Sequence, residues 1–164
     1  MRYLFFAVIL VVACATGAAA DPLEEAEYEY ERSDYTQAAR LFRPLAEQGL
    51  ARAQYKLGLM YAKGQGLPQD YQEALMWYHK AAEQGDALAQ HNLGVMYDNG
   101  RGTRQDYIRA HMWYSVAAEA LSGDEGRKAM NERDFVASDM TAEQIGKAQE
   151  MARRCQETKF KECD

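Results

Sequence analysis

The side chains best suited to catalysis or metal binding in this chain are three histidines, His79, His91 and His111. Histidine is a general acid–base catalyst and the commonest metal ligand in proteins. A metal site, however, needs several ligands at a defined spacing, and the sequence contains neither H-E-x-x-H nor C-x-x-C. It also lacks G-x-S-x-G and S-x-x-K, patterns that contain a nucleophilic serine. We therefore expect a protein that is not an enzyme, with no catalytic residue, no metal site and no cofactor.

Two glycine pairs, at 64–66 and 100–102, have the G-x-G form that occurs in some phosphate-binding loops. A phosphate-binding loop follows a strand, and its glycine pattern continues to G-x-x-G before a helix. Neither feature accompanies these two pairs. We interpret both as turns between helices.

The N-terminal segment has the form of a secretory signal peptide. A single charge, Arg2, precedes an apolar run at 4–13, and Ala18-Ala19-Ala20 provides a cleavage site. The run is too short for a transmembrane span, so we predict cleavage after Ala20 and a periplasmic or secreted protein. In the alternative, Val11-Val12-Ala13-Cys14 is a lipobox, and an acylated Cys14 anchors the protein to a membrane.

Cys155 and Cys163 are the two cysteines that remain after either cleavage. An even number in an oxidising compartment favours one disulfide. Residues eight apart on one helix lie about 12 Å from each other, which is beyond disulfide reach. A bridge therefore requires the helix to end between them and the tail to fold back. The alternative is two free thiols at a frayed end.

The formal charge of the 164-residue chain is −6 at neutral pH. An acidic surface repels nucleic acid and anionic membranes, so we expect neither as a partner. The length without the signal peptide suits a single domain.

The elements that must position these residues follow a repeat. Tyr35, Tyr71 and Tyr107 are 36 residues apart, and 17 of 36 positions are identical between 35–70 and 71–106. A fixed period of this length is typical of a solenoid, in which stacked units bury one another's apolar faces. This architecture favours binding over catalysis.

Each unit contains two segments with helical spacing and no alternating run. Ala74, Trp77, Tyr78, Ala81 and Ala82 fall on one face, and the pattern recurs in the neighbouring units. Helix starts are marked by aspartates at the N-cap position, namely Asp34, Asp70 and Asp106. Helix-interior glycines, Gly58 and Gly94, cost about 1 kcal/mol each against alanine. We therefore expect a neighbouring helix to approach closely at both.

The pattern A-x-A-Q-x-x-L-G-x-M-Y-x-x-G-x-G-x-x-x-D-Y-x-x-A-x-x-W-Y-x-x-A-A-E-x-G, at 51–85, closely resembles the Sel1-like repeat, a relative of the tetratricopeptide repeat. The resemblance implies an all-α fold, a right-handed α-α solenoid of helix hairpins. Residues 21–49 are then an N-terminal half-unit, and 50–85 and 86–121 are two repeats. Residues 122–164 form a degenerate capping unit and tail, with capping helices at 123–138 and 142–156.

Tetratricopeptide-like stacks present the first helix of each unit on the concave side. Carried over to this sequence, that geometry predicts a partner-binding groove lined by Arg52, Tyr55, Leu59, Ala62, Lys63, Leu88, His91, Val95, Asp98 and Asn99. Polar, aromatic and exposed apolar groups are mixed there, as a peptide-binding surface requires. The alternative is an ordinary solvated face, because scattered exposed apolar residues are common.

The resemblance implies a non-catalytic adaptor of the bacterial envelope or secreted space that binds a protein or peptide partner. A second hypothesis is penicillin-binding or weak β-lactamase activity, assigned to secreted relatives with a cysteine pair in every repeat. Only Cys155 and Cys163 have that spacing here, outside the clear repeats. A third hypothesis is a structural envelope protein that self-associates through its end units.

Overall fold

The computed structural model describes residues 21–163, so the predicted signal peptide and Cys14 lie outside the described residues. These residues form helices only, which confirms the all-α prediction. The helices are α1 (Pro22–Glu31), α2 (Tyr35–Glu47), α3 (Ala51–Lys63), α4 (Tyr71–Ala82), α5 (Ala87–Asn99), α6 (Tyr107–Ala120), α7 (Gly123–Ala137) and α8 (Ala142–Glu157). None of them combines the length and the apolar character needed to cross a bilayer.

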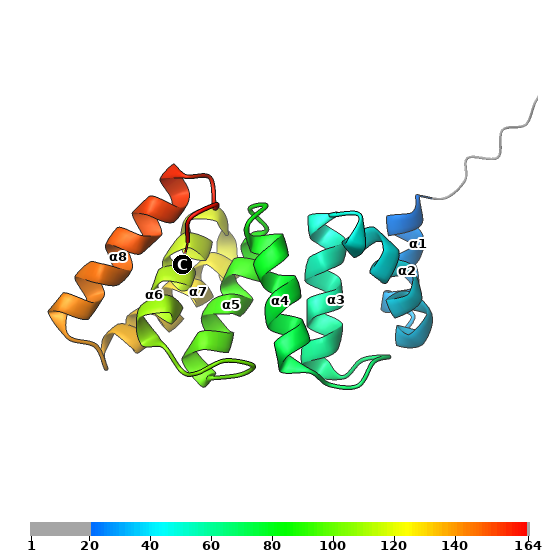
Figure 1. Cartoon of the computed structure of the whole chain (residues 1–164), viewed down its shortest axis with the longest axis horizontal. Coiled ribbons are helices and arrows are strands. Elements are labelled where there is room, and N and C mark those ends of the chain that lie inside the picture. Colours follow the sequence, from blue (N-terminus) through cyan, green and yellow to red (C-terminus); the bar gives the residue numbers. More distant parts are fainter. Residues whose placement is uncertain (1–20, 164) are drawn as a thin grey trace, which may run out of the picture.

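The helices form a row that runs from α1 at one end to α8 at the other (Figure 1). Consecutive helices pack against each other along most of this row, with α3 against α4, α4 against α5, and α5 against α6. Each unit therefore buries its apolar face on its sequence neighbours. This arrangement is the α-solenoid expected from the 36-residue period.

The predicted helix starts and glycine contacts are both present. Asp34, Asp70 and Asp106 each cap the helix that follows, with side chains that accept hydrogen bonds from backbone N–H groups of the first turn. A Cβ atom on Gly58 would lie 2.9 Å from the Tyr78 ring, and one on Gly94 would lie 2.6 Å from the Tyr114 ring. These glycines therefore allow the tyrosine of the next helix to pack directly on the helix backbone.

Each G-x-G turn joins the two helices of one unit and contacts the first residue of a helix in the previous unit. Gly66 and Gly102 have φ angles of 68° and 71°, in the left-handed region that favours glycine. A Cβ atom on Gly66 would lie 2.2 Å from the carbonyl oxygen of Tyr35, and one on Gly102 would lie 2.3 Å from that of Tyr71. Each turn thus packs on the first residue of a helix in the row, α2 or α4. This tight contact is the role of the second glycine.

Two apolar clusters form the core and meet at α4. The first lies between α1 and α4 and includes Phe42, Leu57 and Trp77. The second lies between α4 and α8 and includes Tyr78 and Trp113. Adjacent residues on α4 thus face different clusters, and so this helix joins the two halves of the row.

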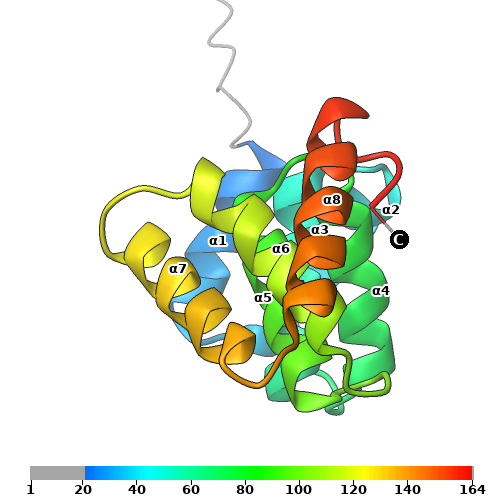
Figure 2. The same ribbon diagram turned by 90° about the vertical axis from the view of Figure 1, so that its left-hand side faces the viewer.

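The C-terminal unit departs from the hairpin pattern. α7 and α8 both pack against α6, and they make little contact with each other. Viewed along the row, they lie on opposite sides of α6 (Figure 2). The predicted capping helices are therefore present, but each covers a different face of α6.

The tail after α8 folds back as a Cys155–Cys163 bridge requires, and the two cysteines form a disulfide. The chain reverses through Lys159 and Phe160, which have positive φ angles. Phe160 then lies beside Gly85, in the turn between α4 and α5. The C-terminal tail therefore packs against the turn between α4 and α5, in the middle of the row.

Candidate functional site

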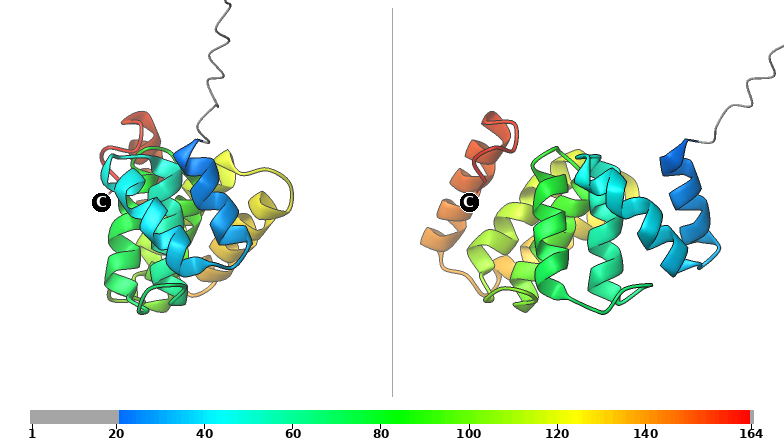
Figure 3. Two further views of the ribbon diagram at one scale, coloured as in Figure 1. Left: turned by 90° about the vertical axis from the view of Figure 1, so that its right-hand side faces the viewer. Right: turned by 45° about the vertical axis from the view of Figure 1, so that its right-hand side comes forward.

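α1, α3, α5 and α7 are the first helices of their units. The side of the molecule that they form together is called the inner face. Seen from either end, α1 and α7 lie on one side of the row and α4 and α8 on the other (Figures 2 and 3). α1 and α7 flank α3 and α5 on the inner face. The predicted groove residues belong to α3 and α5, so they lie in the central part of this face.

A cavity of about 160 Å³ opens between α3 and α5. It brings together four residues of the predicted set, which are Leu59, Ala62, Lys63 and Val95. The remaining lining residues come from α4, α5 and the loop after α5, and they are Tyr71, Tyr78, Asn92, Met96 and Arg101. We call this cavity and its lining residues the α3–α5 cavity.

The α3–α5 cavity has an apolar floor and a cationic rim. Tyr78 and Met96 are buried beneath it, and Leu59 and Val95 are half-buried on its walls. Lys63 and Arg101 are exposed at its edge. The Arg101 guanidinium lies 5.6 Å from the centre of the Tyr71 ring, a cation–π contact that holds the cation beside the opening.

On the α1 side of the cavity, two other basic residues of α3 contact α1. Arg52 Nε donates to Glu27 Oε1 at 2.9 Å, and the Lys56 ammonium lies 4.5 Å from the centre of the Tyr30 ring. Burial, with the nearby Arg52 charge, lowers the pKa of Lys56. Tyr55 is half-buried, and its ring is tilted against that of Tyr78 at 6.1 Å. Arg52 and Tyr55 therefore lie on the inner face, next to the cavity but not in its lining.

On the α7 side, the structure differs from the sequence-based expectation for His91. Its side chain is buried, with an exposed fraction of 5%. Its Nε2 lies 2.5 Å from Glu132 Oε2 of α7, and its ring packs against Tyr114. Because the α7 carboxylate covers the imidazole, His91 is not available to line an open groove.

Two carboxyl groups on the α7 side, Glu132 and Asp139, act electrostatically on Asp98 in the last turn of α5. Burial, Glu132 and Asp139 raise the pKa of Asp98 above its ordinary value, and hydrogen bonding with Tyr114 opposes that shift. This part of the inner face is therefore electronegative. Of the other predicted residues, Leu88 is half-buried, and Asn99 is exposed and donates its side-chain N–H to the Val95 carbonyl oxygen. Neither lines the cavity.

The sequence-based groove did not include five lining residues, which are Tyr71, Tyr78, Asn92, Met96 and Arg101. Asn92 occupies the repeat position of Lys56, one helical turn from Leu88, so a full helical wheel would have placed it on this face. Arg101 lies between the two glycines of a turn, and no periodic pattern locates such a residue. Only the folded loop places it at the cavity.

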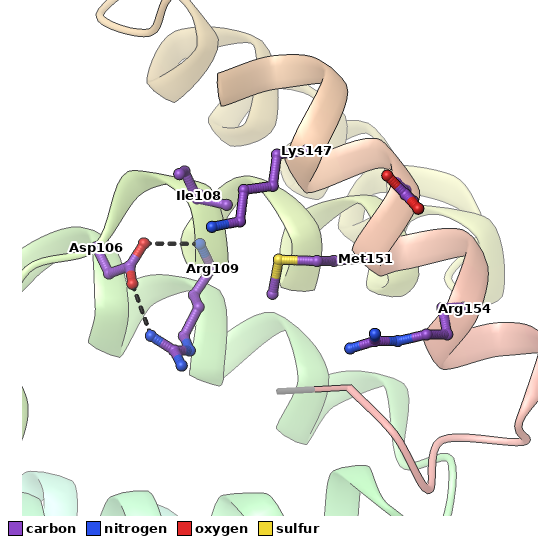
Figure 4. Close-up of a pocket in the computed structure, with 7 residues that line it drawn as sticks. Asp106, Ile108, Arg109, Lys147, Met151 and Arg154 are labelled. Atoms are coloured by element: carbon purple, nitrogen blue, oxygen red, sulfur yellow. Dashed lines mark hydrogen bonds and ion pairs between the residues drawn. The ribbon is translucent and has the colours of Figure 1, made fainter. Parts of the chain in front are cut away.

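A second cavity, of about 360 Å³, lies between the start of α6 and α8 (Figure 4). Its charged lining residues have both signs, and the Arg109 guanidinium donates to Asp106 at 2.8 Å. Lys147 and Arg154 of α8 approach from the opposite wall, with Met151 between them. Polar and apolar atoms contribute about equally to this lining.

A third cavity, of about 570 Å³, separates α7 from α8 and contains His111 and Ser115. Ser115 Oγ donates to the His111 backbone oxygen at 2.8 Å, and its distance to the imidazole Nδ1 is 3.4 Å. Asp134 accepts from Arg133 at 2.7 Å. Burial, and then the Arg133 charge, lower the pKa of His111. Because the Ser115 hydroxyl donates to the backbone of its own helix, it is arranged as a structural group and not as a nucleophile paired with His111.

Among residues 21–163 no group of three or more potential metal ligands occurs.

Comparison with known proteins gives one family. The Sel1 repeat model matches residues 27–50, 51–86 and 87–120. No curated protein gives a significant match.

Two solved structures are similar over most of the chain. One is a protective antigen present in uropathogenic Escherichia coli strains and displaying an SLR fold, with a TM-score of 0.78 and 28% identity over 87% of this chain. The similar region spans 30% of that antigen's chain. The other is a Sel1 repeat protein from Oxalobacter formigenes, with a TM-score of 0.59 and 32% identity, covering 67% of this chain and 86% of that one.

Proposed function

Because this chain belongs to the Sel1 repeat family, we propose that it is a non-catalytic adaptor that binds a segment of a partner protein on its inner face. Sel1 repeat proteins are generally protein-interaction adaptors. The observation that supports this site is the α3–α5 cavity, in which half-buried Leu59 and Val95 surround a buried floor. Apolar pockets with a polar rim are where partner side chains contribute most binding energy.

The proposed location is the periplasm or the extracellular space, after cleavage behind Ala20. The Cys155–Cys163 disulfide supports this location, since disulfides persist in oxidising compartments. A lipid anchor at Cys14 is the alternative, and N-terminal sequencing of the mature protein distinguishes the two. An N-terminus at Asp21 would support cleavage after Ala20.

Site-specific photo-crosslinking tests the binding face. A photoreactive amino acid at position 59 or 95 should capture the same partner in cells, as identified by mass spectrometry. The control position is Met76 of α4, which is 40% exposed and lies outside the α3–α5 cavity. Excess unlabelled protein should compete with capture from 59 and 95. Equal capture of that partner from position 76 would contradict the proposed face.

A further inference from the structure

The rim of the α3–α5 cavity carries two cations that have no carboxylate partner within residues 21–163. Lys63 forms no ion pair there, and the contact of Arg101 is with the Tyr71 ring. Several other basic groups among residues 21–163 are paired with carboxylates, such as Arg52 with Glu27 and Arg133 with Asp134. The formal charge of the whole chain is −6. Two cations without a carboxylate partner among the described residues therefore stand beside an apolar opening, where they can bind a carboxylate of another molecule.

The size of the cavity limits what can enter it. Its volume of about 160 Å³ is close to the roughly 150 Å³ of an apolar cavity that holds benzene. One medium-sized apolar side chain therefore fits between Leu59 and Val95. The cations stand at the edge of the same opening, within reach of a neighbouring residue of the inserted segment.

The side of α5 that faces α7 has the opposite charge. Asp98 belongs to α5 and Glu132 to α7, and Asp139 follows α7; the charges of Glu132 and Asp139 both act on Asp98. A carboxylate in that region would be repelled, whereas the same carboxylate over Lys63 and Arg101 would be attracted. The charge distribution therefore distinguishes the two directions in which a segment could cross the groove.

We infer that the partner segment carries an apolar side chain that enters the α3–α5 cavity, next to an aspartate or glutamate that binds Lys63 and Arg101. The acidic residue lies toward α3 and the loop after α5, and the segment continues toward α7 without further acidic groups. This inference rests on the proposed function and names the chemistry of its partner.

A random dodecapeptide library displayed on phage is the probe. Selection uses the full chain without its signal peptide, and only clones that fail to bind Val95→Trp, which fills the cavity, are kept. These clones should share an apolar residue adjacent to aspartate or glutamate. For the synthetic peptides, the Lys63→Glu/Arg101→Glu variant should bind on the order of ten-fold or more weakly, because two attractive charged contacts are lost and charge reversal adds repulsion.

Matched variants separate local contacts from general charge effects. Arg104→Glu/Lys147→Glu changes the net charge equally at exposed positions outside the cavity, and should bind the peptides like the wild type. Peptides in which lysine replaces the acidic residue should regain affinity for Lys63→Glu/Arg101→Glu. Circular dichroism melts should show that all variants remain folded.

Three other results of these binding experiments would each contradict the inference in a different way. Cavity-dependent peptides without an acidic preference would overturn this inference and leave the proposed function standing. Failure to obtain any cavity-dependent peptide would count against both. Binding to phosphatidylglycerol vesicles that is lost in Lys63→Glu/Arg101→Glu would assign the cations to a lipid surface, and so overturn the inference in a different way.

Discussion

At the scale of single residues, Glu132 connects two parts of the inner face. Its carboxylate contacts buried His91 at 2.5 Å, which satisfies an imidazole that would otherwise lose its hydrogen bonds to water. The same charge raises the pKa of Asp98, in addition to the effect of burial. One residue of the degenerate unit therefore both covers a predicted groove residue and makes its neighbourhood electronegative.

This arrangement predicts that Asp98 costs stability at neutral pH. Because its folded-state pKa is raised above the ordinary 3.8, its ionisation is less favourable in the folded protein than in the unfolded chain. The stabilising contribution of neutral Asp98 is complete below pH 3.8 and is lost as the pH rises through the folded-state value. Asp98→Asn should therefore melt at a higher temperature than the wild type at pH 7, and the difference should narrow as the pH falls toward 4.

Carboxyl NMR titration provides the control. The Asp98 signal should titrate above pH 3.8 in the wild type and at a lower pH in Glu132→Gln, because one repulsive charge is removed. An Asp98 signal that titrates at or below 3.8 in the wild type would refute the assignment.

At the scale of helices, close packing depends on two glycines. Gly58 and Gly94 occupy equivalent repeat positions, and each lies against a tyrosine of the next helix, Tyr78 or Tyr114. Glycine lowers helix propensity at both positions, and closer packing offsets this cost because glycine has no Cβ atom to separate the two helices. The large buried tyrosine then fills the space between the backbones.

Gly94→Val should lower the free energy of unfolding by on the order of 1–3 kcal/mol, because the new side chain overlaps the Tyr114 ring. Gly146 of α8 is the matched control, since a Cβ atom there would have nothing within 4 Å. The same substitution at Gly146 should change stability by less than about 0.5 kcal/mol. Urea denaturation measures both, and equal effects at the two positions would contradict the packing argument.

At the scale of the whole molecule, stability is distributed along the row through contacts between neighbours. The contact of Gly66 with Tyr35 recurs 36 residues later as that of Gly102 with Tyr71, and the Gly58–Tyr78 contact recurs as Gly94–Tyr114. A solenoid with repeated interfaces of this kind can be lengthened by one unit. The junction is favourable because Asp86, which caps α5, would precede the inserted helix.

A chain with residues 51–86 duplicated should therefore fold, with more helix and a higher free energy of unfolding. The gain should be about 2–5 kcal/mol, from a typical stability of roughly 0.05–0.15 kcal/mol per residue. Circular dichroism and urea denaturation measure both quantities. An insertion that is unfolded, or no more stable than the wild type, would show that the interfaces are not interchangeable.

The sequence by itself determined the features that repeat. Helical faces, aspartate caps and the close approach at Gly94 follow from local periodicity, and an α-helix places residues three and four apart on one side wherever it occurs. The reversal between Cys155 and Cys163 also follows from local geometry, because a continuous helix holds the two residues too far apart. Leu59, Lys63 and Val95 meet at one cavity because repeated helices present equivalent positions side by side.

Only the tertiary structure decided what lies outside the period. α7 belongs to a unit whose sequence no longer follows the repeat, so its packing on α6 and the burial of His91 beneath Glu132 could not be derived from spacing. Arg101 reaches the cavity through a loop whose path depends on contact with α4. The sign of charge on each side of α5 depends on these non-local placements, because electrostatic interactions depend on distances in space rather than along the chain.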